Sequence, residues 1–151
     1  LPPPTLSPLL PYPAPFRSFL DLDGFKPIND TLGHDNGDLV LREAAVRLTG
    51  CIRDADTAAR FGGDEFVLVL SDLNAAEDSI SVADKVLGAL SEPFHLSGHT
   101  AHVGASIGIA FYPDHGLNAE TILKHADNAM YDVKSDGKNN YAFATTLKAA
   151  Q

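Results

Sequence analysis

Hydrophobic and polar positions follow two different periods along this chain, one typical of strands and one typical of helices. The clearest two-residue period spans Val103–Phe111, where mostly larger residues at odd positions alternate with Gly, Ser and Ala at even positions. This alternation predicts a strand with one bulky and one small face, and a small face allows a helix to lie close over the sheet. Apolar runs predict three further strands, over Arg17–Leu22, Phe66–Leu70 and Tyr141–Ala144.

Four other segments have apolar residues at helical spacing. The predicted helices span Phe25–Leu32, Asp38–Ile52, Ala75–Leu90 and Ala119–Val133. Gly33 ends the first of them, and Asn74 is the predicted N-cap of the third. The pair Gly62 and Gly63 precedes an apolar run, which is typical of a hairpin turn that needs positive φ.

Strands and helices therefore alternate around a central hairpin. This order favours an α+β fold of the ferredoxin-like, split βαβ kind, with a central antiparallel sheet flanked by helices, over a doubly wound sheet. Seven of the ten prolines lie in residues 1–16, so this stretch is expected to be an extended tail or linker. Residues 17–146 form the expected domain, and residues 147–151 the expected C-terminal tail.

The charge of the chain narrows its possible partners. Lys and Arg number 11 against 20 Asp and Glu, a formal net charge of −9. Such an acidic chain is not expected to bind a nucleic acid polymer or an anionic membrane surface, because both call for basic residues. With the single Cys51 and no apolar run long enough to span a bilayer, a cytoplasmic location is expected.

Some of the acidic residues gather at predicted strand ends. Asp21 and Asp23 close the first strand, and Asp64 and Glu65 follow the glycine pair at the start of another. Antiparallel neighbours would bring these carboxylates to one edge of the sheet, where the Leu22 carbonyl could join them. Oxygen ligands of this kind suit Mg²⁺. The alternative interpretation is that Asp and Gly simply form turns here.

The segment Phe61–Phe66, Phe-Gly-Gly-Asp-Glu-Phe, resembles the signature of the GGDEF-domain diguanylate cyclases. Other blocks agree with this family in order and spacing, and the resemblance covers about residues 17–144. These blocks are Asp21–Asp30, Gly33–Asp38, Val103–Ile109 and Ala126–Asn139. The family's usual opening block, Asp-x-Leu-Thr-Gly-Leu-x-Asn-Arg, has no counterpart in residues 1–16, so an N-terminally truncated or atypical member is expected.

The resemblance implies a nucleotidyl-cyclase palm that condenses two GTP molecules into cyclic di-GMP and releases two pyrophosphates. It implies a homodimer with opposed active sites, and two Mg²⁺ or Mn²⁺ ions in each site. By position, Asp21, Asp64 and the carbonyl of Leu22 would hold the ions. Glu65 would deprotonate the 3′-hydroxyl or hold a metal, so Asp64 and Glu65 are the expected catalytic residues.

The resemblance also implies where the nucleotide binds. The expected guanine-binding residues are Asn29 and Asp38. The expected phosphate-binding groups are Gly24, Phe25, Lys134 and Lys138, the last standing where the family commonly has Arg. From the residues alone, the favoured interpretation of Asp38 is a carboxylate that satisfies backbone N–H groups at a helix start.

Arg53 and Asp56 match the Arg-x-x-Asp site through which many members bind their product and are inhibited. The alternative interpretation is a local ion pair between the two side chains. For the function there is also an alternative, a catalytically impaired GGDEF module that serves as a receptor for cyclic di-GMP or GTP.

Overall fold

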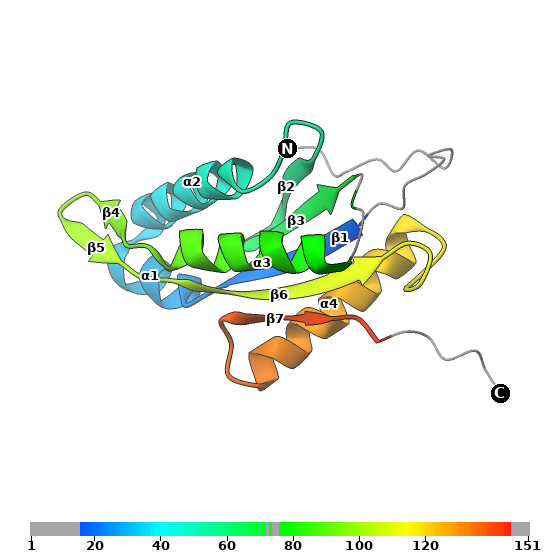
Figure 1. The fold of residues 1–151 in the computed structure, drawn as a ribbon. Helices are drawn as coiled ribbons and strands as arrows, with labels where there is room; N and C mark the ends of the chain where they lie inside the picture. Colours follow the sequence, from blue (N-terminus) through cyan, green and yellow to red (C-terminus); the bar gives the residue numbers. More distant parts are fainter. Residues whose placement is uncertain (1–15, 72, 74–75, 146–151) are drawn as a thin grey trace.

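The computed structural model describes residues 16–71, 73 and 76–145 (Figure 1). The predictions for residues 1–15, for Asn74 as an N-cap and for residues 146–151 lie outside the described residues. In chain order the elements are β1 (Phe16–Asp23), α1 (Phe25–Leu32), α2 (His34–Gly50), β2 (Thr57–Gly62), β3 (Glu65–Leu70), α3 (Ala76–Ser91), β4 (Phe94–Leu96), β5 (His99–Ala101), β6 (Gly104–Phe111), α4 (Ala119–Ser135) and β7 (Asn140–Phe143).

The strand β1 lies at the centre of a five-stranded sheet with the order β2-β3-β1-β6-β7. It pairs antiparallel with both β3 and β6, and β2 pairs antiparallel with β3. The edge strand β7 runs parallel to β6, because α4 returns the chain across the sheet before β7 begins. The predicted α+β fold is confirmed, and its antiparallel sheet carries one parallel edge strand. The separate β4–β5 hairpin was not predicted, because three-residue strands show too little alternation.

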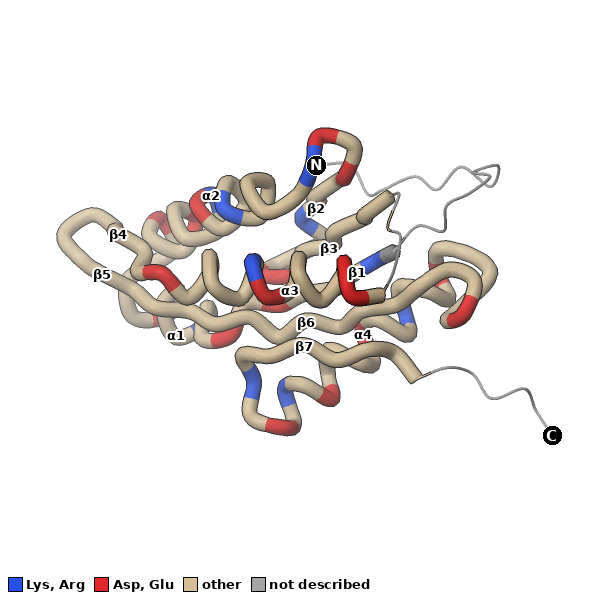
Figure 2. Tube along the Cα trace, in the orientation of Figure 1, with Lys and Arg blue, Asp and Glu red and all other residues tan. Residues whose placement is uncertain are grey.

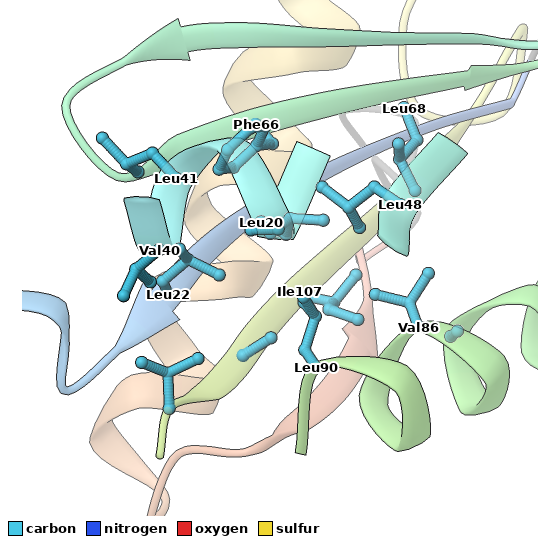
Figure 3. Packing of buried hydrophobic residues seen from close by; sticks show 14 of the residues in the cluster. Leu20, Leu22, Val40, Leu41, Leu48, Phe66, Leu68, Val86, Leu90 and Ile107 are labelled. Carbon is cyan, nitrogen blue, oxygen red and sulfur yellow. The ribbon is translucent and has the colours of Figure 1, made fainter. Parts of the chain in front are cut away.

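Helices cover both faces of the sheet (Figure 1). On one face, Leu20 of β1 belongs to a buried cluster with Leu48 of α2 and Leu90 of α3 (Figure 3). On the other face, Phe19 of β1 packs in a second cluster with Ala126 of α4. Successive strand residues point to opposite faces. The odd-numbered residues of β1 therefore face α4.

The small face of β6 lets α4 approach the sheet closely, as the alternation predicts. A Cβ atom added to Gly108 would lie 1.8 Å from the carbonyl oxygen of Ala126 in α4. On the opposite face of β6, Ile107 and Ile109 belong to the cluster with α2 and α3. The docking of α4 thus depends on the missing side chain at position 108.

The helix α2 begins at His34, four residues before its predicted start at Asp38. The two glycines at positions 33 and 37 disfavour a helix over this stretch. Gly37 is nevertheless helical and buried, and a Cβ atom there would lie 2.3 Å from Oδ1 of Asn29. The contact between α1 and α2 therefore outweighs the local propensity. Within the described ranges, no helix is long and apolar enough to cross a membrane.

Candidate active site

The acidic residues of the first and third strands meet at one edge of the sheet, as predicted. The register of the β1–β3 pair places Asp21 opposite Glu65. Next to this pair, the backbone N–H of Leu22 donates a hydrogen bond of 3.1 Å to the carbonyl oxygen of Asp64. The tight turn between β2 and β3 contains Gly63 at a φ of +48°, which suits glycine. The sheet thus fixes Asp21, Asp64 and Glu65 in a small volume.

Asp21 is buried and only partly satisfied by the protein. Its exposed fraction is 6%, and Nζ of Lys134 donates to its Oδ2 at 2.5 Å. Its Oδ1 is buried with no hydrogen-bond partner. Burial raises the pKa of Asp21 to about 6; Lys134 opposes this shift, and neighbouring Asp64 adds to it. The site has one lysine against several carboxylates, and a cation near Oδ1 would relieve the imbalance.

The same excess of negative charge shifts the pKa values of the neighbouring Glu65 and Lys134. Burial raises the pKa of Glu65, and the charges of Asp21 and Asp127 raise it further, against the effect of Lys134. Burial lowers the pKa of Lys134, but its hydrogen bond to Asp21 and the surrounding carboxylates outweigh burial, so the pKa of this lysine is raised. Lys134 therefore stays protonated at the centre of the acidic cluster.

The donor set fits a hard divalent cation that shares its ligands with a substrate. Among the described residues, no group of three His, Cys, Asp or Glu side chains is arranged to hold a metal by itself. Mg²⁺ commonly takes only one or two carboxylates and completes its shell with waters and substrate phosphates. The carboxylates of Asp21 and Asp64, with the unpartnered Oδ1 of Asp21, match this requirement.

Asp23 is the one acid of the predicted group that points to other partners. Oγ of Ser106 donates to its Oδ1 at 2.8 Å and to its Oδ2 at 3.0 Å. The backbone N–H of Asn139 also donates to Oδ2, at 2.9 Å. Asp23, which was not among the expected metal ligands, therefore joins β1 to β6 and to the turn after α4.

The predicted guanine-binding residues lie on α1 and α2, which meet where Gly37 contacts Asn29. Asp38 is exposed and is the fifth residue of α2, so it does not cap the helix start, and that alternative is wrong. Asp38 lines a groove of about 370 Å³ between α2 and the β2–β3 hairpin. Arg42 and Arg60 also line this groove, and the sequence analysis missed both. Arg42 follows Asp38 by four residues, and Arg60 precedes Gly62 by two. These two spacings were the signal available in the sequence.

The predicted phosphate-binding groups lie at two chain turns beside the acidic cluster. Gly24 has a φ of +84° and precedes α1, whose first turn has no side-chain cap. Free N–H groups at a helix start favour anions. Lys134 lies in the last turn of α4, and Lys138 lies in the turn between α4 and β7 with a φ of +67°. Basic positions flank an acidic one along this turn (Figure 2).

A family model described as diguanylate cyclase, GGDEF domain, matches residues 18–140. The chain belongs to the GGDEF-domain family. It is 46% identical over 125 residues to the bifunctional diguanylate cyclase/cyclic di-GMP phosphodiesterase MucR of Pseudomonas aeruginosa, a match that covers 83% of this chain and 18% of MucR. It is 42% identical over 125 residues to the cyclic di-GMP phosphodiesterase NbdA of the same organism, covering 83% of this chain and 16% of NbdA. The chain thus spans less than a fifth of either relative.

Solved structures of GGDEF domains confirm the fold. The GGDEF domain of TpbB, also called YfiN, from Pseudomonas aeruginosa has a TM-score of 0.85 and 39% identity, with 87% of this chain and 83% of that chain covered. The GGDEF domain of DgcB from Caulobacter crescentus, in complex with c-di-GMP, has a TM-score of 0.78 and 27% identity, with 87% and 78% covered. The palm-like fold predicted from the sequence is therefore that of this GGDEF domain.

The Arg53–Asp56 pair lies at the other end of the β2–β3 hairpin from the Gly62–Gly63 turn of this GGDEF domain. Nε of Arg53 donates to Oδ2 of Asp56 at 3.3 Å, and the same carboxylate accepts from the backbone N–H groups of Arg53 and Ser71. The side chain of Asp56 is 3% exposed and that of Arg53 is 56% exposed. The local ion pair exists, and it leaves the Arg53 side chain accessible.

Proposed function

We propose that this GGDEF domain condenses two GTP molecules into cyclic di-GMP and releases two pyrophosphates. The observation that carries the proposal is the β1–β3 register, which places Asp21 opposite Glu65 and beside Asp64 while Oδ1 of Asp21 lacks a partner. The unpartnered oxygen of Asp21 and the neighbouring carboxylate of Asp64, next to an uncapped helix start and two lysines, provide for both the metal and the phosphates of a nucleoside triphosphate.

In this proposal Asp21, Asp64 and the Leu22 carbonyl would hold two Mg²⁺ or Mn²⁺ ions, and the bound ions would supply positive charge to the triphosphate and to the α-phosphorus. Lys134 now donates to Asp21, and in the substrate complex it exchanges this carboxylate for a phosphate oxygen. The backbone N–H groups of Gly24 and Phe25 bind the β- and γ-phosphates at the start of α1. Lys138 adds a second positive charge from the turn after α4.

The reaction requires the 3′-oxygen of each GTP to attack the α-phosphorus of the other, so that two phosphodiester bonds form and two pyrophosphates leave. The bond from that phosphorus to the β-phosphate oxygen breaks, and pyrophosphate leaves. Glu65 accepts the proton of the 3′-hydroxyl. Burial and neighbouring carboxylates raise the pKa of Glu65, which brings its basicity closer to that of an effective general base at neutral pH.

Guanine selectivity follows from Asn29 and Asp38 at the contact between α1 and α2. A carboxylate accepts hydrogen bonds from N1–H and the 2-amino group of guanine, and the Asn29 amide completes the recognition of that edge. Adenine has no such donor pair, so ATP would leave Asp38 unpaired and would bind more weakly.

One domain supplies one set of nucleotide-binding groups, whereas the reaction joins two nucleotides. We therefore propose that two copies of the domain form a homodimer with opposed active sites. The exposed Arg53 and its partner Asp56 would bind the product outside the active site and inhibit the enzyme. An Arg guanidinium binds O6 and N7 of guanine through a pair of hydrogen bonds.

The direct test is to incubate the chain with GTP and Mg²⁺ and to separate the products by chromatography. Cyclic di-GMP and pyrophosphate are expected from the wild-type chain, and neither is expected from Asp64→Asn or Glu65→Gln. A matched control is Glu120→Gln, which removes one carboxylate from the first turn of α4. Undiminished synthesis by either active-site variant would refute the assigned site.

The similarity to NbdA, which is named as a phosphodiesterase, favours one second candidate. The domain could bind GTP or cyclic di-GMP and regulate a neighbouring domain without catalysis. Calorimetric titration separates the two functions. Binding of either nucleotide without turnover supports the receptor, and turnover supports the cyclase.

A further inference from the structure

We propose that Asp23 is a positioning residue. Its hydrogen bonds hold the turn between α4 and β7 against the sheet, so that Lys138 and Lys134 face the triphosphate. This inference rests on the proposed function. Asp23 is two residues from Asp21, and the alternation of β1 places both side chains on the α4 face of the sheet. The two carboxylates nevertheless have different partners, and this difference carries the inference.

The Asp23 carboxylate connects three separate segments. It ends β1, accepts from Oγ of Ser106 in β6 at 2.8 and 3.0 Å, and accepts from the backbone N–H of Asn139 at 2.9 Å. Asn139 returns the contact, since its Oδ1 accepts from the backbone N–H of Ala105 at 3.4 Å. A Cβ atom at Gly104 would lie 2.9 Å from that Oδ1, so the glycine leaves room for the Asn139 side chain.

The turn at Gly137–Asn139 has an unfavourable backbone conformation that needs such contacts. Gly137, Lys138 and Asn139 have φ values of +114°, +67° and +49° in succession. Residues other than glycine rarely adopt positive φ, and two in a row need support from the surrounding structure. The N–H of Lys138 bonds to the carbonyl of Val133 at 3.0 Å, which closes the end of α4. The bond from Asn139 to Asp23 is the one that ties the turn to β1.

Both proposed phosphate-binding lysines depend on this arrangement. Lys138 immediately precedes Asn139, whose backbone N–H donates to Asp23. This hydrogen bond therefore fixes the position from which the Lys138 side chain extends. Lys134 lies one helical turn earlier and reaches Asp21. Loss of Asp23 would therefore remove the hydrogen bond that holds the turn after α4 to β1.

Asp23 acts through other residues and is not assigned to the metal or to the reacting atoms. Both of its oxygens already accept hydrogen bonds from the protein, in contrast to Oδ1 of Asp21. Its contribution should be specific to the β- and γ-phosphates, because the guanine-binding residues lie on α1 and α2. This specificity separates positioning of the lysines from general support of the fold.

The test uses the 151-residue chain in Mg²⁺ buffer and two ligands measured by calorimetry. One ligand is a GTP analogue with a methylene group between the α- and β-phosphates, and the other is GMP. We expect Asp23→Ala to weaken the analogue about tenfold, the lower end of the effect of removing residues that orient a ligand group. Its affinity for GMP should stay within about twofold, since the guanine contacts remain intact.

A double-mutant cycle identifies Lys138 as the group that Asp23 positions. Lys138→Ala should weaken the analogue in the wild-type chain and should add less than about twofold when Asp23 is already Ala. Asp136→Ala is the matched control, because it removes the same charge from the same turn, and the hydrogen bonds of Asp23 come from Ser106 and Asn139. If Asp23→Ala does not fold, Ser106→Ala removes one donor to Asp23 and should weaken the analogue by a smaller factor, again without affecting GMP.

Unchanged affinity for the analogue, equal weakening of both ligands, or additive effects of the two mutations would each overturn the role of Asp23. If the wild-type chain itself fails to bind the analogue, the proposed function is contradicted as well. If the wild-type chain binds the analogue but makes no cyclic di-GMP, only the catalytic part of the proposed function is contradicted, and the role of Asp23 is still decided by the two ligands.

Discussion

Arg47 of α2 holds the end of α3 in place, and replacing it should destabilise the domain. Its Nη1 donates to the carbonyls of Ala89 and Glu92 at 3.0 and 2.7 Å, and its Nη2 donates to the carbonyl of Pro93 at 2.7 Å. The guanidinium carbon lies 3.8 Å from the centre of the Phe94 ring. The last carbonyls of a helix lack partners within the helix, so Arg47 satisfies groups that would otherwise need water.

The expected magnitude follows from these contacts. Removing a hydrogen bond that involves a charged group costs roughly 1.5–3 kcal/mol, and a cation–π contact contributes about 0.5–2 kcal/mol. Water can replace Arg47 at the exposed carbonyl of Glu92, so the three bonds do not add fully. The ion pair with the half-exposed Glu43 adds at most about 1 kcal/mol. Arg47→Met should therefore lower the free energy of unfolding by about 3 kcal/mol.

Urea unfolding followed by circular dichroism measures this loss from the midpoint at constant slope. Arg47→Lys keeps the charge but not the planar arrangement of donors, and should lose about half as much. Lys124→Met removes an exposed lysine of α4 and should change stability by less than about 0.5 kcal/mol. A loss below about 1 kcal/mol for Arg47→Met would refute the reasoning, because it would show that water replaces the guanidinium without penalty.

Four further outcomes are expected. Arg17 in β1 is fully buried, and none of its guanidinium nitrogens has a hydrogen-bond partner in the described residues. Arg17→Leu should therefore raise the free energy of unfolding by about 1–3 kcal/mol. A lower urea midpoint for this variant would contradict the expectation. Arg53→Ala should relieve inhibition by added cyclic di-GMP while the initial rate persists, and unchanged inhibition would remove Arg53 from the product site. Initial rates per protomer should rise with protein concentration if catalysis requires two facing domains, and a constant rate in a chain shown to be monomeric would contradict the dimer. Burial lowers the pKa of His115, whose Nδ1 accepts from the N–H of Phe111 at 2.8 Å. The stabilisation by His115 should therefore be complete above its unfolded pKa of about 6.5 and should be lost as the pH falls below it. The stability difference between wild type and His115→Gln should shrink between pH 7.5 and 5, and a constant difference would refute the linkage.

Much of the site was accessible from the sequence because its parts are local. The run before Asp21 and the glycine pair before Asp64 define two strand ends, and carboxylates at strand ends meet if the strands pair. That these two strands are antiparallel neighbours was an assumption, and the structure confirms it. Arg42 and Arg60 were missed, since only the packing of α2 against the hairpin places them on one groove.

The sequence by itself determined the periodic elements and one feature of their packing. The alternation over Val103–Phe111 specifies a strand with a small face, and Gly108 on that face determines how closely α4 approaches. These features depend on residues within a few positions of one another, so their pattern is visible in the printed chain.

Only the tertiary structure decided the different roles of Asp21 and Asp23, which look equivalent in the sequence. Asp21 meets Lys134, 113 residues later, while Asp23 meets Ser106 and Asn139, which are 83 and 116 residues later. Which partner each carboxylate finds depends on strand order, register and the path of the turn after α4. Such contacts form only when distant segments pack together, because no local energy term distinguishes two aspartates separated by one residue.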